Sequence, residues 1–225
     1  MDDRTLTRRG SLASLGAGIL ALLGLKVGRA SAGGPDAVAS GLVTCVLTPE
    51  LTEGPYYVAG ERVRRNITEG RPGVPLALRL RVVDVSTCRP IEGAAVDVWH
   101  ADAGGVYSGF GAGRSNRTFM RGIQRTDANG LATFQTVYPG WYMGRTVHVH
   151  VKVHVGGSVV HTGQLFFPDA LTDQVYRRSP YSKRPGRDVR NADDSIFVNG
   201  GSRSTLTVRK HGAGYVGSIA MGVRA

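Results

Sequence analysis

The sequence predicts an all-β protein, an antiparallel β-sandwich with long loops and little helix. Short runs that alternate apolar and polar residues recur along the chain, and Gly, Pro, Asn and Asp separate them. Glycine is abundant, at 32 of 225 residues, and helical periodicity is almost absent. The length suits one domain with a sizeable core, since all-β domains often reach this size.

The first stretch, residues 1–32, is predicted to be a signal peptide and takes no part in the fold. Basic residues precede an apolar run at Leu12–Leu25, and the small residues Ala30-Ser31-Ala32 follow it. The pair Arg8-Arg9 resembles the twin-arginine signal, which exports folded proteins from bacterial cells. We therefore expect an exported protein, extracellular or envelope-associated, without stable membrane insertion after signal removal. Retention of the segment as an anchor is the alternative.

The charge of the chain is strongly basic. Removal of residues 1–32 lowers the net charge from +11 to +8, because it takes away five basic and two acidic groups. Nucleic-acid binding is the usual explanation for such a charge, but here the arginines are scattered rather than clustered in one run. We expect no nucleic-acid partner. Attraction to an anionic envelope or to aromatic acids remains consistent with the charge.

After a flexible N-terminus at 33–41, rich in Gly, Ala, Ser and Pro, residues 42–225 are expected to form the single β-sandwich domain. The turn Asp127–Gly130 predicts a hairpin into the strand that follows it. One helix is expected at Ala170–Arg178, with Asp169 as its N-cap, and Arg177–Arg190 reads as a surface loop. The predicted strands are Leu76–Val85, Ala94–His100, Leu131–Val137, Thr146–Val155, Ser158–Phe167, Ser204–Lys210 and a weaker Tyr215–Ala220.

The two cysteines, Cys45 and Cys88, have neither a CxxC pattern nor a metal-ligand spacing. In an exported protein, an even number of cysteines favours a disulfide, here one that closes a loop of 43 residues. Chain entropy gives such a bond roughly 3–4 kcal/mol. Two buried free thiols are the alternative.

The strand Thr146–Val155 alternates strictly, so its valines face one side and its polar residues the other. His148 and His150 lie two residues apart on the polar face, which places their imidazoles roughly 6–7 Å apart, given a rise of about 3.3 Å per residue. Two histidines so placed can share a metal ion. The competing interpretation is the polar outer face of a surface strand.

A His-x-His strand also begins the cupin type of iron site, which needs a glutamate a few residues later. The chain has none there, because the first acidic residue downstream is Asp169. Two tyrosines precede the histidines instead, Tyr142 and Tyr107. Phenolate oxygens are hard anionic ligands that suit a ferric ion.

Four segments resemble the intradiol ring-cleavage dioxygenases, and most closely the protocatechuate 3,4-dioxygenase-like core and its small exported relatives. The resemblance extends from about Thr48 to Phe167. No long helical segment like the dimerisation segment of the catechol 1,2-dioxygenases precedes it, so oligomeric state stays open, with a homodimer as one alternative. The segments are Thr52-Glu53-Gly54-Pro55-Tyr56-Tyr57, Ala94 to Tyr107, Tyr138-Pro139-Gly140-Trp141-Tyr142 and Arg145 to His150.

The resemblance implies one Fe(III) per chain, O2 as co-substrate and a small catecholic substrate. The ring would be cleaved between its two hydroxylated carbons, giving cis,cis-muconate-type diacids. The implied iron ligands are Tyr107, Tyr142, His148 and His150. Of these, Tyr142 is expected to be the ligand that the substrate displaces, with Tyr107 as the alternative. A β-sandwich binding module without turnover is the competing function.

The resemblance also implies roles around the metal. Arg145 would stabilise the electron-rich substrate carbon, reaching the site from a turn that Gly144 permits, and Gln164 would orient O2 or the anhydride. A surface arginine and a sheet-face glutamine are the alternatives. The expected pocket walls are Pro55, Tyr56 and Trp141, for which plain packing is equally consistent. Three further histidines, His100, His154 and His161, are left outside the metal site.

Overall fold

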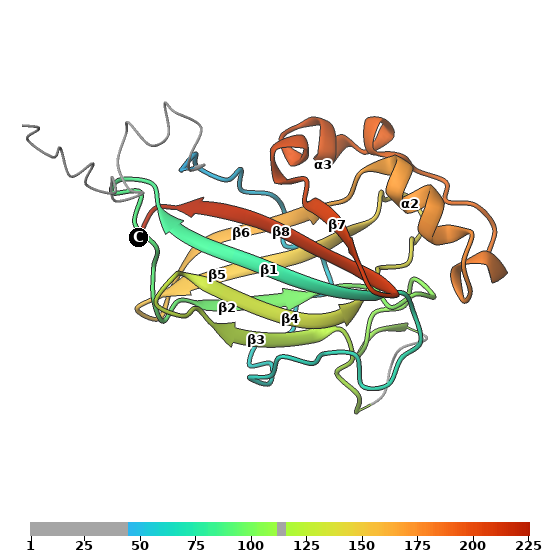
Figure 1. Cartoon of the computed structure of the whole chain (residues 1–225), viewed down its shortest axis with the longest axis horizontal. Coiled ribbons are helices and arrows are strands. Elements are labelled where there is room, and N and C mark those ends of the chain that lie inside the picture. The colour runs from blue at the N-terminus through green and yellow to red at the C-terminus, as the bar shows by residue number, and fades with distance from the viewer. Residues whose placement is uncertain (1–44, 112–115) are drawn as a thin grey trace, which may run out of the picture. The chain divides into compact units, whose positions relative to one another are not determined.

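The computed structural model describes residues 45–111 and 116–225, and its strands form two four-stranded sheets (Figure 1). The predicted signal peptide at 1–32 and flexible segment at 33–41 lie outside the described residues. Sheet A has the order β4-β1-β8-β7 and sheet B the order β3-β2-β5-β6. The strands of sheet A are β1 Pro75–Asp84, β4 Leu131–Val137, β7 Thr207–His211 and β8 Gly214–Val223, and those of sheet B are β2 Ala95–Trp99, β3 Arg121–Arg125, β5 His148–Val155 and β6 Ser158–Phe166.

The core lies between the two sheets. Val149, Val151 and Val153 of β5 are fully buried in it, together with Leu78 and Leu80 of β1. Strand periodicity explains this placement, because alternate side chains point to the same face. Each fully buried valine or leucine contributes roughly 1.5–3 kcal/mol. The predicted all-β sandwich is confirmed, with one pair, β1 and β8, running parallel.

The outer face of sheet B is also covered, by the chain before β1. Leu51 donates its backbone N–H to Thr162 on the edge strand β6. Val63 forms a parallel bridge with Ile123 on the opposite edge strand, β3. The segment 51–63 therefore crosses the outer face of sheet B, and His148 and His150 of β5 are buried on that side too.

Two sequence predictions of local structure were wrong. The turn Asp127–Gly130 does not close a hairpin, because it joins β3 of sheet B to β4 of sheet A, which pairs with β1. Asp169 is not the N-cap of its helix, α2 (Asp169–Tyr176): Pro168 is, without a side-chain cap. The carboxylate of Asp169 instead pairs with Arg187. Strand β3 was not predicted at all.

The connection from β6 to β7 carries the helices, with α2 and α3 on the same side of the sheets (Figure 1). Helix α3, Ser195–Val198, has a side-chain cap, since Asp194 accepts from the N–H groups of Ile196 and Phe197. The same connection holds three 3₁₀ turns, Tyr181–Lys183, Asn191–Asp193 and Gly201–Ser204. No helix in the described ranges has the length and apolar character needed to cross a membrane.

The structure joins Cys45 and Cys88 in a disulfide. The bond ties the start of the described chain to the turn after β1, in which Cys88 has a positive φ of 55°. A closed loop of this length lowers the entropy of the unfolded chain by an amount equivalent to roughly 3–4 kcal/mol.

Candidate metal centre

The structure brings the four predicted ligands together at one end of sheet B. His148 and His150 begin β5, Tyr142 lies in the loop before it, and Tyr107 lies in the loop between β2 and β3. The two Nε2 atoms of the histidines are 3.1 Å apart, and the Tyr142 hydroxyl lies 3.1 Å from Nε2 of His148. The Tyr107 ring centroid is 5.5 Å from that of Tyr142 and 6.1 Å from that of His150.

This geometry fits a shared metal ion. Ligand atoms bound at about 2.1 Å and at right angles to one another would lie about 3.0 Å apart. The Tyr142 hydroxyl and the His150 Nε2 each lie 3.1 Å from the His148 Nε2, close to that value. Among the described residues, no group of three or more His, Cys, Asp or Glu side chains could hold a metal. A metal at the two histidines would therefore need the phenol oxygens.

Both histidines are neutral, the form that binds metals. Burial lowers the pKa of His148 to about 3, with the nearby Arg145 acting in the same direction. Burial and the neighbouring His148 place the pKa of His150 well below its usual value. His148 Nδ1 lies 2.7 Å from the carbonyl oxygen of Thr146, which can only accept. The ring proton therefore sits on Nδ1, and Nε2 keeps a lone pair for a metal.

Tyr107 has a buried hydroxyl that makes no hydrogen bond of good geometry with the described residues, although it lies close enough to the Tyr142 hydroxyl to interact with it. Such a group is costly to bury unless something else satisfies it. Burial, reinforced by the adjacent Tyr142, raises its pKa well above the usual value. Burial also raises the pKa of Tyr142, although Arg145 opposes the shift. Both phenols stay protonated unless a strong cation, such as a metal ion, draws off the proton.

His150 is held by packing rather than by a hydrogen bond on its outer nitrogen. Its ring stacks on Trp99, with centroids 4.9 Å apart and an interplanar angle of 6°, while its Nδ1 has no partner in the described structure. Gly54 closes the other side: a Cβ there would lie 3.1 Å from Cε1 of His150, and its φ is +72°. Only glycine fits this close approach without strain.

Arg145 reaches the site from a turn, as expected, and β5 begins only at His148. Gly144 supplies the positive φ of 79° in that turn. The Arg145 guanidinium donates from Nε to Asp194, at 2.8 Å, and from Nη2 to the side-chain oxygen of Gln164, at 2.6 Å. The Gln164 amide nitrogen donates to the carbonyl of Thr52 at 2.8 Å. Both the oxygen and the nitrogen of the Gln164 side-chain amide are thus hydrogen-bonded, to Arg145 and to Thr52 respectively.

A cavity of about 210 Å³ opens beside the two tyrosines. Tyr56, one of the predicted wall residues, lines it and stacks on Tyr107 with ring centroids 4.3 Å apart. The other two predicted wall residues lie elsewhere. Pro55 is exposed, and Trp141 stacks with Arg184 and donates to the carbonyl of Pro185. The described lining is Tyr56, Gly105, Val106, Tyr107, Phe110, Gly111 and Tyr142.

Sequence reasoning missed two charged residues behind the ligands. Arg121 is 1% exposed and donates to the Ser108 side chain, the Ser108 carbonyl and the Tyr56 carbonyl. Asp194 is 3% exposed and accepts from Arg145. No local pattern distinguishes either residue, because arginine and aspartate are usually exposed and their partners lie far away in sequence.

Comparisons with known proteins agree with this site. The family model described as Dioxygenase matches residues 52–177. The chain is similar to the solved intradiol ring-cleavage dioxygenase from Tetranychus urticae, with 36% identity and a TM-score of 0.77, over 80% of this chain and 95% of that one. It is also similar to the dioxygenase domain of a carbohydrate-binding fusion protein from Streptomyces sp. SirexAA-E, with 33% identity and a TM-score of 0.63, over 80% and 99%.

Among curated proteins, catechol 1,2-dioxygenase 2 from Acinetobacter lwoffii is 39% identical over 99 residues. That match covers 42% of this chain and 35% of the relative, so it spans about a third of the relative's length. The family model, by contrast, spans more than half of this chain, and the two solved structures match along nearly their whole length. This chain therefore belongs to the intradiol ring-cleavage dioxygenase family.

Proposed function

We propose that the protein is an exported non-haem Fe(III) dioxygenase that cleaves catechol-type rings between the two hydroxylated carbons, yielding cis,cis-muconate-type diacids. The observation that carries the proposal is the convergence of two phenols and two neutral imidazoles, with ligand atoms 3.1 Å apart, beside a cavity of about 210 Å³. The residues that would hold the iron are Tyr107, Tyr142, His148 and His150.

Iron held by these residues would supply Lewis acidity that withdraws electron density from a catechol and makes its ring reactive toward O2. Tyr142 is half-buried and lines the cavity, so its oxygen, a phenolate when it binds the metal, would be the one placed to accept a substrate proton. Tyr107, which is 5% exposed, stays in place. Arg145 supplies a fixed cation next to the ligand cluster, and a preorganised charge of this kind stabilises charge that develops in the substrate.

Export is part of the same proposal, and it rests on the sequence of residues 1–32, with its basic start, apolar run and small residues before the domain. A twin-arginine route would carry the folded protein with its metal already bound. Mass spectrometry of the protein secreted by its host would show a mature chain that begins near residue 33. Retention of residues 1–32 would contradict a cleaved signal.

The enzyme proposal is tested on the iron-loaded protein. We expect a visible tyrosinate-to-iron absorption band, oxygen uptake with at least one of catechol, protocatechuate and hydroxyquinol, and a diacid that contains both atoms of isotope-labelled O2. If the protein stayed colourless and inactive after iron loading, the enzyme proposal would be contradicted. A β-sandwich binding module without turnover would then be the better interpretation. The panel of substrates also identifies the preferred ring.

A Tyr142→Phe variant tests the site itself. We expect it to change the shape of the visible band and to lower turnover by more than about a hundredfold, because the variant removes one ligand and one proton acceptor. Tyr215→Phe, on β8 in sheet A, is the matched control and should change neither. Full activity of Tyr142→Phe would remove Tyr142 from the site.

A further inference from the structure

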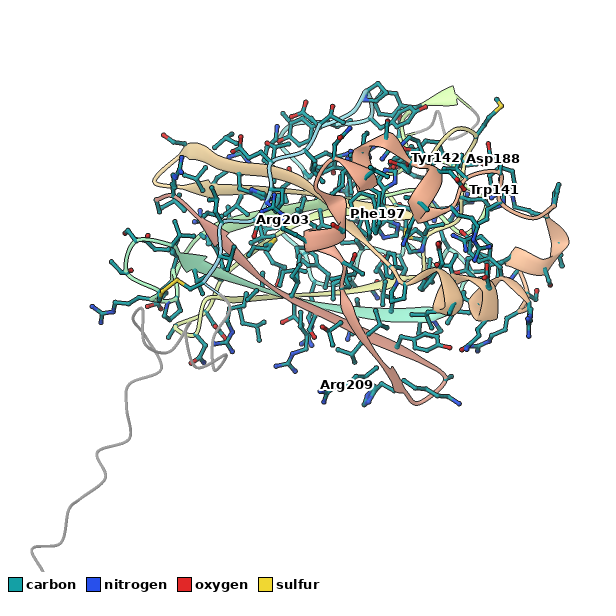
Figure 2. All side chains as sticks on the ribbon, turned by 90° about the horizontal axis from the view of Figure 1, so that it is seen from above. Trp141, Tyr142, Asp188, Phe197, Arg203 and Arg209 are labelled. Atoms are coloured by element: carbon teal, nitrogen blue, oxygen red, sulfur yellow. A yellow bond between two sulfur atoms is a disulfide. The ribbon has the colours of Figure 1, made fainter. Side chains whose placement is uncertain are left out.

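The segment Arg184–Asp194, here named the clasp, is hydrogen-bonded to the loop 141–146, which carries Tyr142 and Arg145. Arg184 donates to the Trp141 carbonyl at 2.8 Å, and Asp188 accepts from the Gly144 N–H at 2.8 Å. Figure 2 shows Asp188 beside Trp141 and Tyr142. The clasp lies beyond residues 52–177, the range that the family model matches.

Asp194 makes the closest contact of the clasp with the site. Its Oδ2 accepts from Arg145 Nε at 2.8 Å and from the Thr146 N–H at 2.9 Å. Its Oδ1 accepts from the N–H groups of Ile196 and Phe197, at 2.9 and 3.0 Å. The side chain is 1% exposed. Four donors therefore hold this carboxylate in one orientation, and water has almost no access to it.

Arg145 needs such a partner. A free arginine side chain samples many rotamers, and ordering it costs up to about 2 kcal/mol. The charged hydrogen bond to Asp194 and the one to Gln164 fix two of the three guanidinium nitrogens. Gln164 is neutral and can direct the guanidinium only weakly, whereas the Asp194 carboxylate carries a full charge.

We propose that Asp194 is the positioning residue of the site: its carboxylate aligns the Arg145 guanidinium for reaction with the catechol. This inference rests on the proposed function. Asp194 touches none of the four candidate iron ligands directly and acts on the site through Arg145 and the Thr146 peptide. The Thr146 carbonyl in turn accepts from His148 Nδ1, so the same carboxylate anchors the backbone just before the first histidine.

The competing role of Asp194 is structural, as the cap of α3. Asp194→Asn separates the two roles, because asparagine is as good an N-cap as aspartate but lacks the charge. We expect kcat to fall about 10- to 100-fold, the range typical of lost partners around a metal site, with KM for catechol within about twofold. The melting temperature should fall, because the asparagine amide nitrogen cannot accept from the Thr146 N–H. The visible band and the iron content of the iron-loaded protein should stay close to those of the wild type.

Asp173→Asn is the matched control. It breaks ion pairs with Arg187 and Arg190 in the same part of the chain but makes no contact with Arg145. Its kcat should be unchanged. An Asp194→Asn variant with normal kcat, or one whose loss of activity is matched by a loss of bound iron, would overturn the positioning role.

A double-mutant cycle tests whether the effect passes through Arg145. In an Arg145→Ala background, Asp194→Asn should lower kcat by no more than about twofold, because the group it aligns is gone. A full 10- to 100-fold loss in that background would show that Asp194 acts by another route.

A measurement without turnover keeps this inference distinct from the proposed function. In NMR spectra of the metal-free protein, the Arg145 Nε–H signal should be resolved and slow to exchange with water, and Asp194→Asn should broaden or remove it. If the wild type cleaves no catechol, the dioxygenase proposal fails, while this signal still reports whether Asp194 orders Arg145. An unchanged signal in Asp194→Asn would overturn the ordering itself.

Discussion

The two loops that supply the tyrosines differ in how tightly they enclose them. Tyr107 is 5% exposed, and its ring stacks on Tyr56. Tyr142 is half-buried and is followed by Met143, which is 84% exposed, and by the turn at Gly144. Two candidate ligands of the same chemistry therefore differ in how tightly their surroundings enclose them, and residues outside the candidate ligand set create the difference.

The supports of the two loops differ in the same way. Arg121 lies beneath the Tyr107 loop and makes three hydrogen bonds to Ser108 and Tyr56, all from inside the protein. The clasp holds the Tyr142 loop on both sides of the tyrosine, at Trp141 and at Gly144, but leaves the ring at the cavity. We infer that the Tyr142 side chain can swing out while its backbone stays in place.

The largest effect is expected from Tyr107→Phe. Because the Tyr107 hydroxyl makes no hydrogen bond of good geometry in the described structure, its removal should cost the metal-free protein no stability, but iron binding should fall by more than about a hundredfold. The measurements are thermal unfolding of the metal-free protein and iron content after loading.

Tyr138→Phe is the matched control, because its buried hydroxyl is hydrogen-bonded to Thr172 at 2.7 Å. It should lose about 1 kcal/mol of stability and keep its iron. If Tyr107→Phe destabilised the metal-free protein as much as Tyr138→Phe does, the Tyr107 hydroxyl would have a structural partner after all.

An intermediate effect is expected from Arg121→Lys. Lysine keeps the charge but cannot reproduce the forked contacts to Ser108 and Tyr56, so unfolding free energy should fall by about 2–4 kcal/mol. The visible band of the iron-loaded protein should shift, because the Tyr107 loop loses its support. Urea unfolding measures the first effect, and absorption spectroscopy the second.

Arg125→Lys, on the same strand, is the control, since Arg125 is exposed and donates only to the Gly93 carbonyl among the described residues. It should change stability by less than about 0.5 kcal/mol. An Arg121→Lys variant with an unchanged band would show that the Tyr107 loop holds its position without Arg121.

The smallest effect is expected at Glu69, which accepts hydrogen bonds from Arg64 and Thr118 close to Arg121. Burial alone would raise its pKa, but hydrogen bonds from Arg64 and Thr118 outweigh burial and hold the pKa of Glu69 at about 2. Arg64 also donates to the carbonyl of Arg121. A carboxyl whose pKa is lowered by folding stabilises the protein above its unfolded pKa, about 4.3, and loses that contribution as pH falls toward 2.

Glu69→Gln should therefore be less stable than the wild type at pH 7, and the gap should close between about pH 5 and pH 2. Denaturant unfolding at several pH values measures it, with the exposed Glu92→Gln as the control. A gap that does not depend on pH would assign the loss to packing rather than to the charge of Glu69.

Much of the fold follows from local patterns. The alternation in Thr146–Val155 predicted which side chains enter the core, and Leu131–Val137 was predicted with its observed bounds. The hairpin at Asp127–Gly130 failed because a turn pattern specifies a change of direction but not which sheet the next strand joins. Strand β3 was missed, since Arg121–Arg125 carries two arginines and one glycine and has no apolar alternation.

The sequence by itself determined the type and order of the candidate ligand side chains, because Tyr107, Tyr142, His148 and His150 occur within recognisable segments, two of the four on one strand face. Only the tertiary structure decided which groups hold them. Arg121, Asp194 and Gly54 act across long sequence separations, through a buried guanidinium, a buried carboxylate and a missing side chain. Their partners lie far away in the sequence and come together only in the folded protein, so no local pattern records these contacts.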